Sequence, residues 1–451
     1  MTPFHPTDRG TLFLLPPSLD EWLPDDHLAR FVEEVVAGLD LSAITSQYRN
    51  GGSLAYHPAT LLCLLIYGYA TGVHSSRKIE QATYDSIAFR YLAGNAHPDH
   101  DTLAHFRRRF LPAIKGLFLQ VLHVAREMKL LKLGLVALDG TKMHANASRH
   151  KALSHGYATR LEAQLRAEVD ELLRLAESAD QKERHLGADL PAELKRRQDR
   201  LEKIAAAKIT IEERNRERLA QEQAEHEKLV ARREAKRSRT GKSPGGRDPN
   251  PPEEGPRPTD QVNLTDPDSR IMPASGGGFE QAYNAQATVA EGSMLVITSH
   301  VSQAPNDMKQ LVSVLEQLEA LEPLLGRPDT LAADAGYCSA SNVEAVEAAG
   351  ITPLIATGRN RHHPHWSERF ETPQETMEDT PIGRLKNRLR TLAGRAQYAK
   401  RKHIVEPVFG IIKRVMGFRQ FSLRGLDRVE GEWDLVCLAW NVRRLAVLRG
   451  K

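Results

Sequence analysis

The sequence predicts an α/β protein that combines a mixed sheet flanked by helices, an all-α N-terminal domain and an inserted helical hairpin or coiled coil. Three observations predict this class. Residues 20–130 repeat apolar side chains at helical spacing. Residues 133–138 (LGLVAL) form a continuous apolar run, and residues 283–289 alternate apolar and polar side chains, as buried and half-buried strands do. Residues 156–237 are rich in Glu, Arg, Lys, Ala and Leu, which is typical of helices that pack on each other.

Length and composition limit the class of protein. At 451 residues the chain exceeds one ordinary core, and its formal net charge of +4 is only mildly basic. The longest apolar run, residues 61–69, falls short of the roughly 18 residues of a membrane span, and no secretion signal is visible. Cys63, Cys338 and Cys437 lack the spacing of disulfide or zinc pairs. We expect a cytoplasmic protein without a membrane partner.

The N-terminal domain, residues 1–130, is expected to consist of helices. One helix ends near Gly72, a second follows Ser75 or Ser76 as its N-cap, and a third begins at Asp101. The third helix carries Arg107, Arg108 and Arg109 on the side opposite its apolar residues. Two interpretations stay open: a DNA-binding domain of helix-turn-helix type, or a helical bundle with a solvated basic face. Under the first, DNA contacts are assigned to Arg77, Lys78, Arg107, Arg108 and Arg109.

Two histidine groups raise the question of metal binding. His97 and His100 lie near acidic residues, and His362, His363 and His365 lie close together in a later loop. Neither group has the spacing of a known ligand set. The first also fits a polar turn between helices, and the second a flexible basic loop that contacts DNA.

The insertion at residues 156–237 reads as an antiparallel helical hairpin or short coiled coil, with a break at residues 187–191. Residues 238–261 are rich in Pro, Gly and charge, which predicts a flexible linker. The charges of the insertion fit a solvated surface, or a contact with DNA or another subunit.

The core is expected in residues 131–155 and 262–451. After the first strand, residues 279–290 and 294–301 form a hairpin, and a helix capped by Asn306 follows. A strand ending at Asp334, a helix at residues 341–349 and a strand at residues 351–357 come next. The order strand, hairpin, helix, strand, helix, strand, helix is compatible with a ribonuclease H-like fold.

The segment at residues 381–425 contains twelve Lys or Arg and one acidic residue, Glu406, a net charge of +11. Such a surface attracts a polyanion. Apolar residues at helical spacing place Glu406 on an amphipathic helix, and Pro407 places it at the start of that helix or at a kink. Lys400 and Lys402 are further candidates for contacts with DNA.

Three carboxylates from distant segments, Asp139, Asp334 and Glu406, can converge at one edge of such a sheet. Their hard oxygen atoms suit Mg²⁺ or Mn²⁺, and two ions would lie about 4 Å apart. Each residue also has a simpler interpretation, since Asp139-Gly140 and Asp334 can be turn residues and Glu406 an exposed surface residue.

The sequence resembles bacterial insertion-sequence transposases of the DDE class. The stretches that carry the resemblance lie almost throughout the chain outside the insertion and linker, and include ALDGTKMHANAS, LTDPDSRIM, AYNAQATV, LAADAGYCSASN and VEPVFGIIKRVMGFRQFSLRGL. In the family the last motif reads Tyr, two residues, Arg, three residues, Glu, six residues, Lys. Tyr398, Arg401, Glu406 and Lys413 match it, except that four residues separate Arg401 from Glu406, whereas Lys402 has the three-residue spacing.

The resemblance implies an enzyme that binds double-stranded DNA at terminal inverted repeats. A metal-bound water would cut the DNA, and the freed 3′-hydroxyl would attack target DNA. Asp139, Asp334 and Glu406 would hold the metal, Arg401 or Lys402 and Lys413 would neutralise the phosphate, and Tyr398 would contact the DNA end. A nucleoid-associated homodimer or larger assembly on DNA is also implied. Two other interpretations stay open: an inactive DNA-binding descendant of a transposase, and a stand-alone ribonuclease H-like nuclease.

Overall fold

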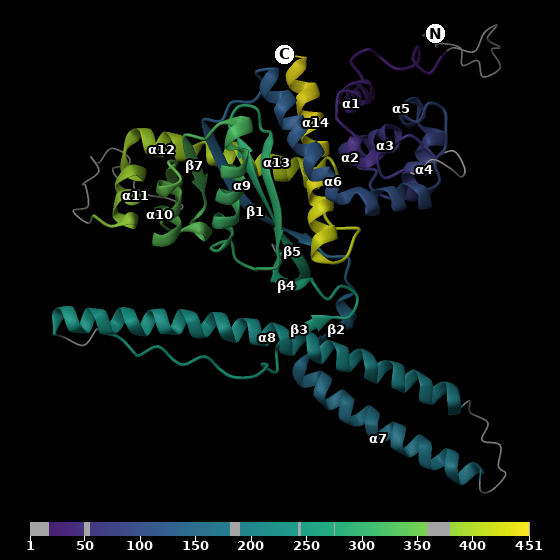
Figure 1. Ribbon diagram of the computed structural model, residues 1–451, viewed down its shortest axis with the longest axis vertical. Helices are drawn as coiled ribbons and strands as arrows, with labels where there is room; N and C mark the ends of the chain where they lie inside the picture. The colour runs from purple at the N-terminus through teal and green to yellow at the C-terminus, as the bar shows by residue number, and fades with distance from the viewer. Residues whose placement is uncertain are drawn as a thin grey trace, which may run out of the picture. The chain divides into compact units, whose positions relative to one another are not determined.

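The computed structural model describes residues 18–48, 55–180, 190–241, 245–274, 276–358 and 379–450. It divides into two compact units. The first contains residues 1–145, 272–278 and 282–451, and the second contains residues 146–271 and 279–281. Among the described helices, none is long and apolar enough to cross a membrane. Figure 1 shows the elements of both units.

The first unit contains a mixed six-stranded sheet. Its strand order is β4-β5-β1-β7-β8, and β6 pairs with β5 off this path. β1 runs antiparallel to β5 and parallel to β7, and β7 runs parallel to β8. The bounds are β1 Leu135–His144, β4 Arg270–Pro273, β5 Phe279–Ala290, β6 Val296–Ser302, β7 Thr330–Ala333 and β8 Thr352–Ile355.

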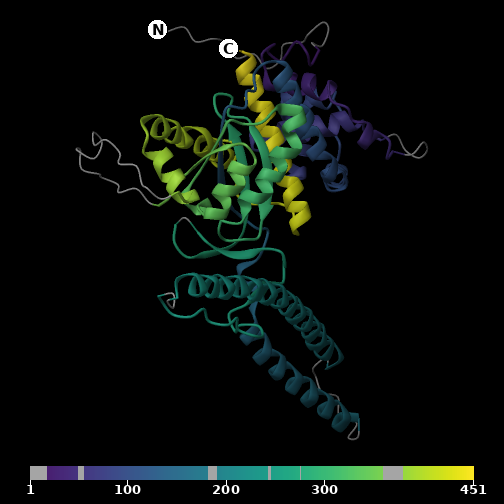
Figure 2. The same cartoon turned by 60° about the vertical axis from the view of Figure 1, so that its left-hand side comes forward.

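Helices follow the strands as the sequence predicts, and the strands lie among them in Figure 2. These helices are α9 Gln310–Leu325, α10 Ala340–Ala348, α11 Pro381–Arg390, α12 Leu392–Ala399, α13 Arg401–Arg414 and α14 Leu426–Arg449. The mixed sheet flanked by helices confirms the predicted ribonuclease H-like class. One local expectation is wrong, because Lys309 and not Asn306 occupies the N-cap of α9.

The N-terminal region is helical, as predicted. Its helices are α1 Leu28–Ala37, α2 Ser42–Thr45, α3 Pro58–Thr71, α4 Ser76–Asp85, α5 Ile87–Leu92 and α6 His100–Glu127. Gly72 ends α3 in the left-handed region, at φ 91°. Asp99, not Asp101, caps α6, because its side chain accepts a hydrogen bond from the Thr102 backbone N–H. Extended backbone at Ser86 separates α4 from α5, where the sequence suggests one helix.

A buried polar cluster joins the N-terminal helices to α14. The Tyr69 hydroxyl on α3 donates to Glu432 Oε1 on α14 at 2.8 Å, and Arg107 Nη1 on α6 donates to the Tyr69 hydroxyl at 2.9 Å. Backbone N–H groups of Ser422 and Leu423 complete the hydrogen bonding of the fully buried Glu432. The N-terminal helices therefore share one interior with the sheet-bearing part of the chain, and Figure 1 shows α14 beside α6.

The second unit is built on a helical hairpin. α7 spans His155–Asp180, α8 spans Leu190–Thr240, and the short strands β2 Ala152–Ser154 and β3 Gln261–Asn263 pair at the base. A small apolar cluster holds the hairpin together: Leu153, Ala158, Leu161, Leu165, Ile204, Ala207, Ile211 and Val262. The segment predicted to be a linker runs along α8 in its described part, where Arg218 pairs with Asp260 at 2.9 Å.

Candidate active site

Two of the three candidate carboxylates lie next to each other in the sheet region, Asp139 within β1 and Asp334 directly after β7. Leu138 of β1 is in register with Ala333 of β7, so the next residues, Asp139 and Asp334, follow side by side where β7 ends. Carboxyl ends of parallel strands are where open α/β sheets form binding sites. Asp334 accepts a hydrogen bond from the Gly336 backbone N–H at 2.8 Å, which begins the short turn Ala335–Tyr337. This bond fixes the Asp334 side chain at the sheet edge.

Asp139 lies within β1, whereas the sequence suggests that the strand ends there in a turn. The antiparallel register with β5 continues from Asp139↔Ala287 to His144↔Ala282, so the Asp-Gly pair stays extended. Gly140 is required there, because a Cβ atom at this position would lie 2.6 Å from Asp307 Oδ1. The absence of a side chain lets Asp307 approach the strand next to the site.

Arg401 joins the third carboxylate to the first. Its Nη1 donates to Asp139 Oδ2 at 3.1 Å, and its Nη2 donates to Glu406 Oε1 at 3.4 Å. The Arg401 side chain is 10% exposed and that of Glu406 is 51% exposed. Both residues belong to α13, whose amphipathic pattern buries Val405, Val408 and Ile412 and leaves Glu406 at the surface. Pro407 lies in the second turn of an unbroken helix, and not in the first turn.

Tyr398 and Lys413 lie at the same site. Burial raises the pKa of the Tyr398 hydroxyl, and the neighbouring Arg401 guanidinium opposes that shift. Lys413 Nζ donates to Thr141 Oγ1 and, at 3.1 Å, to the Lys142 carbonyl. Thr141 is two residues from Asp139 and therefore on the same face of β1. Lys413 is thus fixed to the strand that carries Asp139, while Lys402 is exposed on α13.

Electrostatics at Asp139 point to a site that favours positive charge. Burial raises the pKa of the Asp139 carboxyl to about 6, Arg401 lowers it, and the nearby Asp334 carboxylate raises it further. A buried carboxylate with a second carboxylate beside it is stabilised in its charged form by a cation close to both. In the structure the Arg401 guanidinium supplies part of that charge.

The donor set fits a divalent cation of the magnesium type. All three side chains offer hard carboxylate oxygens, and a guanidinium already bridges two of them. In the described residues no three Asp, Glu, His or Cys side chains are grouped closely enough to enclose an ion. Asp139, Asp334 and Glu406 would hold such a cation, which would supply positive charge where the Arg401 guanidinium now contacts Asp139 and Glu406.

A fourth carboxylate, Asp307, is not among the residues that the sequence singles out. It accepts hydrogen bonds from Asn284 Nδ2 at 2.6 Å and Gln286 Nε2 at 2.7 Å, and it lies 3.8 Å from Lys142 Nζ. The Lys142 ammonium is buried without a hydrogen-bond partner among the described residues. Burial lowers the pKa of Lys142, whereas Asp307, Asp139 and Asp334 raise it. The only sequence signal is an Asp between a buried strand and the next helix.

The predicted DNA-contacting residues divide into two groups. The exposed group contains Arg77, Lys78, Arg108, Arg109, Lys402 and Lys400, of which the last lies 2.7 Å from Glu291. The expectation that Arg107 contacts DNA is wrong, because Arg107 is buried and donates to the Tyr69 hydroxyl and, at 3.1 Å, to the His74 carbonyl. Its guanidinium is needed beside the buried Glu432, so it does not join the solvent-facing cluster.

The two histidine groups give different outcomes. His100 Nδ1 lies 2.7 Å from Glu80 Oε2, and His97 Nδ1 lies 3.0 Å from the Thr83 hydroxyl, so both fill polar contacts between helices. This agrees with the alternative of a polar turn. His362, His363 and His365 lie outside the described residues.

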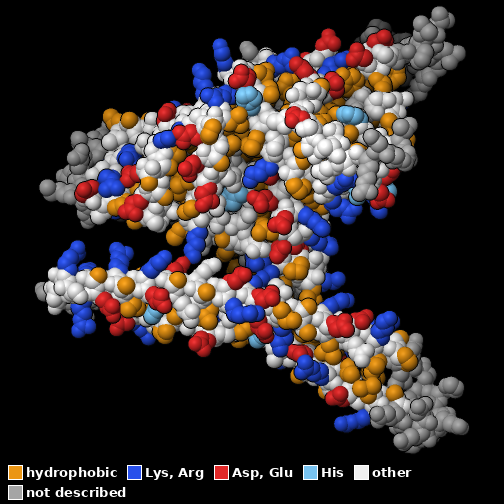
Figure 3. All heavy atoms as spheres, viewed as in Figure 1, with side chains coloured by type: hydrophobic (Ala, Val, Ile, Leu, Met, Phe, Trp, Pro, Cys, Tyr) orange, Lys and Arg blue, Asp and Glu red, His pale blue; other side chains and the backbone are white. Residues whose placement is uncertain are grey.

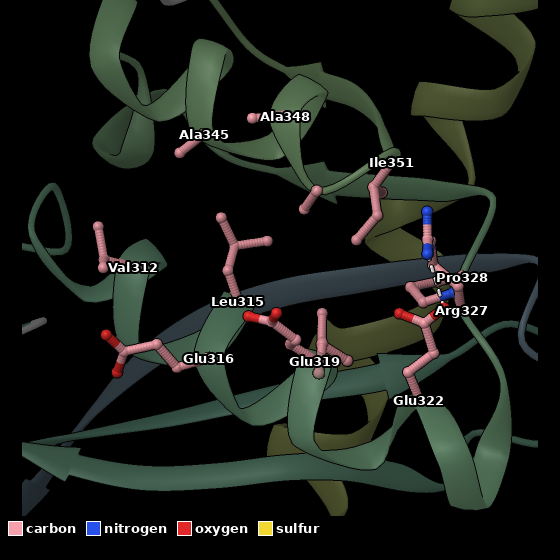
Figure 4. A pocket seen from close by; sticks show the side chains of 12 residues that line it. Val312, Leu315, Glu316, Glu319, Glu322, Arg327, Pro328, Ala345, Ala348 and Ile351 are labelled. Atoms are coloured by element: carbon pink, nitrogen blue, oxygen red, sulfur yellow. Dashed lines mark hydrogen bonds and ion pairs between the residues drawn. The ribbon is translucent and has the colours of Figure 1, made fainter.

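A pocket of about 370 Å³ lies between α9 and α10 and is drawn in Figure 4. Its lining includes Leu315, Glu319, Arg327 and Ile351, and none of Asp139, Asp334 and Glu406. The candidate active site is therefore separate from this pocket. Asp139 lies on β1, Asp334 directly follows β7, and Glu406 lies on α13, which also carries exposed cations. This arrangement suits a long polyanionic substrate.

Comparison with known proteins gives two matches to family models. Residues 256–442 match the family described as "Transposase DDE domain", and residues 17–109 match "Transposase domain (DUF772)". The first match includes Asp334 and Glu406, and the second includes most helices of the N-terminal region. No curated protein and no solved structure matches the chain.

Proposed function

The chain belongs to the DDE transposases of insertion sequences, and we propose that it binds the terminal inverted repeats of its own element, cuts the DNA there and joins the freed ends to target DNA. Members of this class are enzymes that act on DNA. We further propose that the protein recognises the ends of its own element, carries out strand transfer, and assembles as at least two copies that hold two ends together. It also places the protein at the nucleoid of the cell.

One observation carries the proposal: a single guanidinium contacts both Asp139 and Glu406, 267 positions apart in the chain. Asp334 joins them through the β1–β7 register. A buried cation that bridges two carboxylates from different elements marks a place where positive charge is stabilised. Such an environment would bind a divalent metal through the carboxylates, and the metal would in turn bind a phosphodiester.

Asp139, Asp334 and Glu406 would hold Mg²⁺ or Mn²⁺, and bound metal would activate the attacking oxygen and stabilise the leaving one. Arg401 would move from the carboxylates to the phosphate, where its planar fork can donate two hydrogen bonds to one group. Lys413, held by Thr141, would supply fixed positive charge on the same face of β1. Tyr398, beside Arg401, would contact the DNA end.

Asp307 and Lys142 would act as positioning residues in this scheme. Asp307 approaches β1 at Gly140 and fixes the amides of Asn284 and Gln286 on β5. A rigid β1–β5 pair holds Asp139 in one place while the α13 side of the site changes its contacts. Such support by residues that do not touch the substrate is a common requirement for a precise active site.

The test is cleavage of a duplex that carries an inverted repeat from the DNA flanking the coding frame, with Mg²⁺, Mn²⁺ or Ca²⁺. We expect Glu406→Gln to abolish cutting while duplex binding stays within about twofold, since only a metal-binding oxygen is removed. Glu344→Gln is the matched control, because Glu344 is an exposed Glu on α10. Unchanged cutting by Glu406→Gln removes that residue from the site. Absence of cutting by the parent, with binding retained, favours an inactive DNA-binding protein.

A further inference from the structure

The last turns of α8 differ in charge from the rest of that helix. Residues 228–239 carry six Lys or Arg and one acidic residue, Glu234, a net charge of +5. The preceding residues of the helix, 190–227, carry nine Lys or Arg and nine Asp or Glu, a net charge of zero. The positive charge is therefore concentrated in just over three turns.

Four of these cations form a stripe. Lys228, Arg232, Lys236 and Arg239 follow each other at intervals of four, four and three residues, which places them on one side of the helix. All four are exposed. Between the first and the last, the helix rises about 16 Å at 1.5 Å per residue. We call these four residues the basic stripe.

Several cations nearer the start of α8 have acidic partners, whereas no such pair involves the basic stripe among the residues that the structure describes. Arg197 contacts Glu168 at 2.8 Å, and Lys208 contacts Glu162 at 2.8 Å, both across the hairpin. In the described part of the chain, no acidic side chain pairs with a member of the basic stripe. Figure 3 shows blue side chains gathered at the end of α8 that lies away from α7.

The chain itself covers a different side of the same turns. His226 Nε2 lies 3.3 Å from the Pro249 carbonyl, and Arg233 contacts Asp248 at 3.1 Å. At 3.6 residues per turn, the basic stripe is centred about 100° around the helix from these contacts. The segment that packs on α8 therefore leaves the basic stripe open.

Helix stability does not account for the basic stripe. Like charges four residues apart destabilise a helix, so Lys228, Arg232 and Lys236 oppose its formation. The helix dipole favours cations only within the last turn, which contains Arg239 but no other member of the basic stripe. The concentration and exposure of these four cations fit a partner of opposite charge.

We infer that the basic stripe binds the phosphate backbone of duplex DNA, outside the catalytic carboxylates. The inference rests on the proposed function for its choice of DNA as partner. A duplex presents one negative charge per about 1.7 Å of its axis, so a stripe about 16 Å long faces several phosphates. A second copy joined through the same surface about a two-fold axis would place like charges against each other. Contacts with phosphates add affinity without reading sequence.

The experiment measures how duplex binding by the full-length protein depends on salt. The variant combines Lys228→Ala, Arg232→Ala, Lys236→Ala and Arg239→Ala, and the probe is a duplex of arbitrary sequence, about 60 base pairs long. Each phosphate contact contributes about 0.9 to the slope of log K against log salt, so we expect the slope to fall by about 3 to 4. Alanine favours helix, and far-ultraviolet circular dichroism checks that α8 persists.

The control combines Arg174→Ala, Lys195→Ala, Arg200→Ala and Lys203→Ala, four exposed cations elsewhere on the hairpin. We expect its slope to stay within about 1 of the parent. An unchanged slope in the stripe variant overturns the inference, and so does an equal fall in both variants. If sedimentation shows that the stripe variant no longer self-associates while its slope is unchanged, the surface contacts another copy and the inference is wrong.

The cleavage assay separates this inference from the proposed function. A parent protein that cuts its element ends, with an unchanged slope in the stripe variant, keeps the function and rejects the DNA-binding role of the basic stripe. If the parent cuts nothing but the slope of the stripe variant falls by about 3 to 4, the DNA-binding role of the basic stripe is supported and catalysis is rejected.

Discussion

Replacement of Arg401 should affect folding and catalysis, whereas replacement of its neighbour Lys402 should affect neither strongly. The Arg401 side chain is 10% exposed and is hydrogen-bonded to Asp139 and Glu406, while Lys402 is exposed. The sequence alone leaves both residues as candidates for the phosphate contact. The pair therefore forms a matched comparison in which two adjacent cations differ in burial and hydrogen bonding.

The size of the effect follows from the two hydrogen bonds that the Arg401 guanidinium donates. The bond to Asp139, at 3.1 Å, is charge-assisted and partly buried, and such bonds contribute about 1.5–3 kcal/mol. The bond to Glu406 is longer and half-exposed, so it adds at most about 1 kcal/mol. We expect Arg401→Ala to lower the free energy of unfolding of the metal-free protein by about 2–3 kcal/mol at about pH 8, and Lys402→Ala by less than about 0.5 kcal/mol.

Urea unfolding without metal measures this difference. Below the Asp139 pKa of about 6 the carboxyl is protonated and the ion pair is broken, so the effect of Arg401→Ala should shrink as the pH falls from about 8 to about 5. In the cleavage assay Arg401→Ala should abolish cutting, and Arg401→Lys should recover little of it, because an ammonium lacks the planar fork. Equal destabilisation by the two alanine variants, or abolished cutting with Lys402→Ala alone, refutes the reasoning.

Three further predictions use other residues. Burial raises the Asp139 pKa from 3.8 to about 6, so between these pH values the native state holds a proton that the unfolded chain has released. As the pH rises from about 4 to about 7, the free energy of unfolding of Asp139→Asn should therefore rise by up to about 3 kcal/mol relative to that of the parent, as measured by urea unfolding without metal. Asp307→Ala should remove the carboxylate beside Lys142 and the acceptor of the Asn284 and Gln286 amides, and so lower the free energy of unfolding by about 1–3 kcal/mol; Asp307→Asn keeps an acceptor for these amides and should lose less, as measured by urea unfolding. Arg107→Ala should lower the free energy of unfolding by about 3 kcal/mol and leave the salt dependence of duplex binding unchanged. Arg108→Ala should lower the slope of that salt dependence by about 1 and leave the stability unchanged. The reverse pattern would show that Arg107, and not Arg108, contacts DNA.

Much of the fold could be predicted because local patterns agree with the final structure. The apolar run before Asp139 is β1, and the alternating residues are β5, which pairs with β6 as the predicted hairpin. The long Glu- and Arg-rich segment is α7 and α8. In each case the period of apolar residues and the length of the segment are sufficient.

Other features depend on partners that are distant in the chain. Asp139-Gly140 reads as a turn by composition, and only pairing with β5 keeps it extended. The burial of Arg107 depends on Tyr69 and on Glu432, which is more than 300 residues away. Helical spacing places Arg107 on the apolar side of α6, four residues after Leu103 and three before Phe110, but the local sequence does not contain the partners that its guanidinium finds there.

The candidate site residues follow from residue type and from the motif of the family that the sequence resembles, but their hydrogen bonds could not be predicted from the sequence. Arg401 lies four residues before Val405 and seven before Val408, on the buried side of α13, whereas Lys402 is exposed. Asp307 has no periodic signal because it lies in an irregular segment before α9. Its importance appears only from the missing side chain at Gly140 and the nearby ammonium of Lys142.

The buried side chain of Glu432 on α14 limits which truncated forms of the protein can fold. A fragment that starts at residue 131 would lack both Tyr69 and Arg107, leaving only the two amides at Ser422 and Leu423 to solvate that charge. It would also uncover the apolar flank of α14 that normally rests on α3 and α6. Truncation to the catalytic half alone should therefore yield an insoluble or unfolded product.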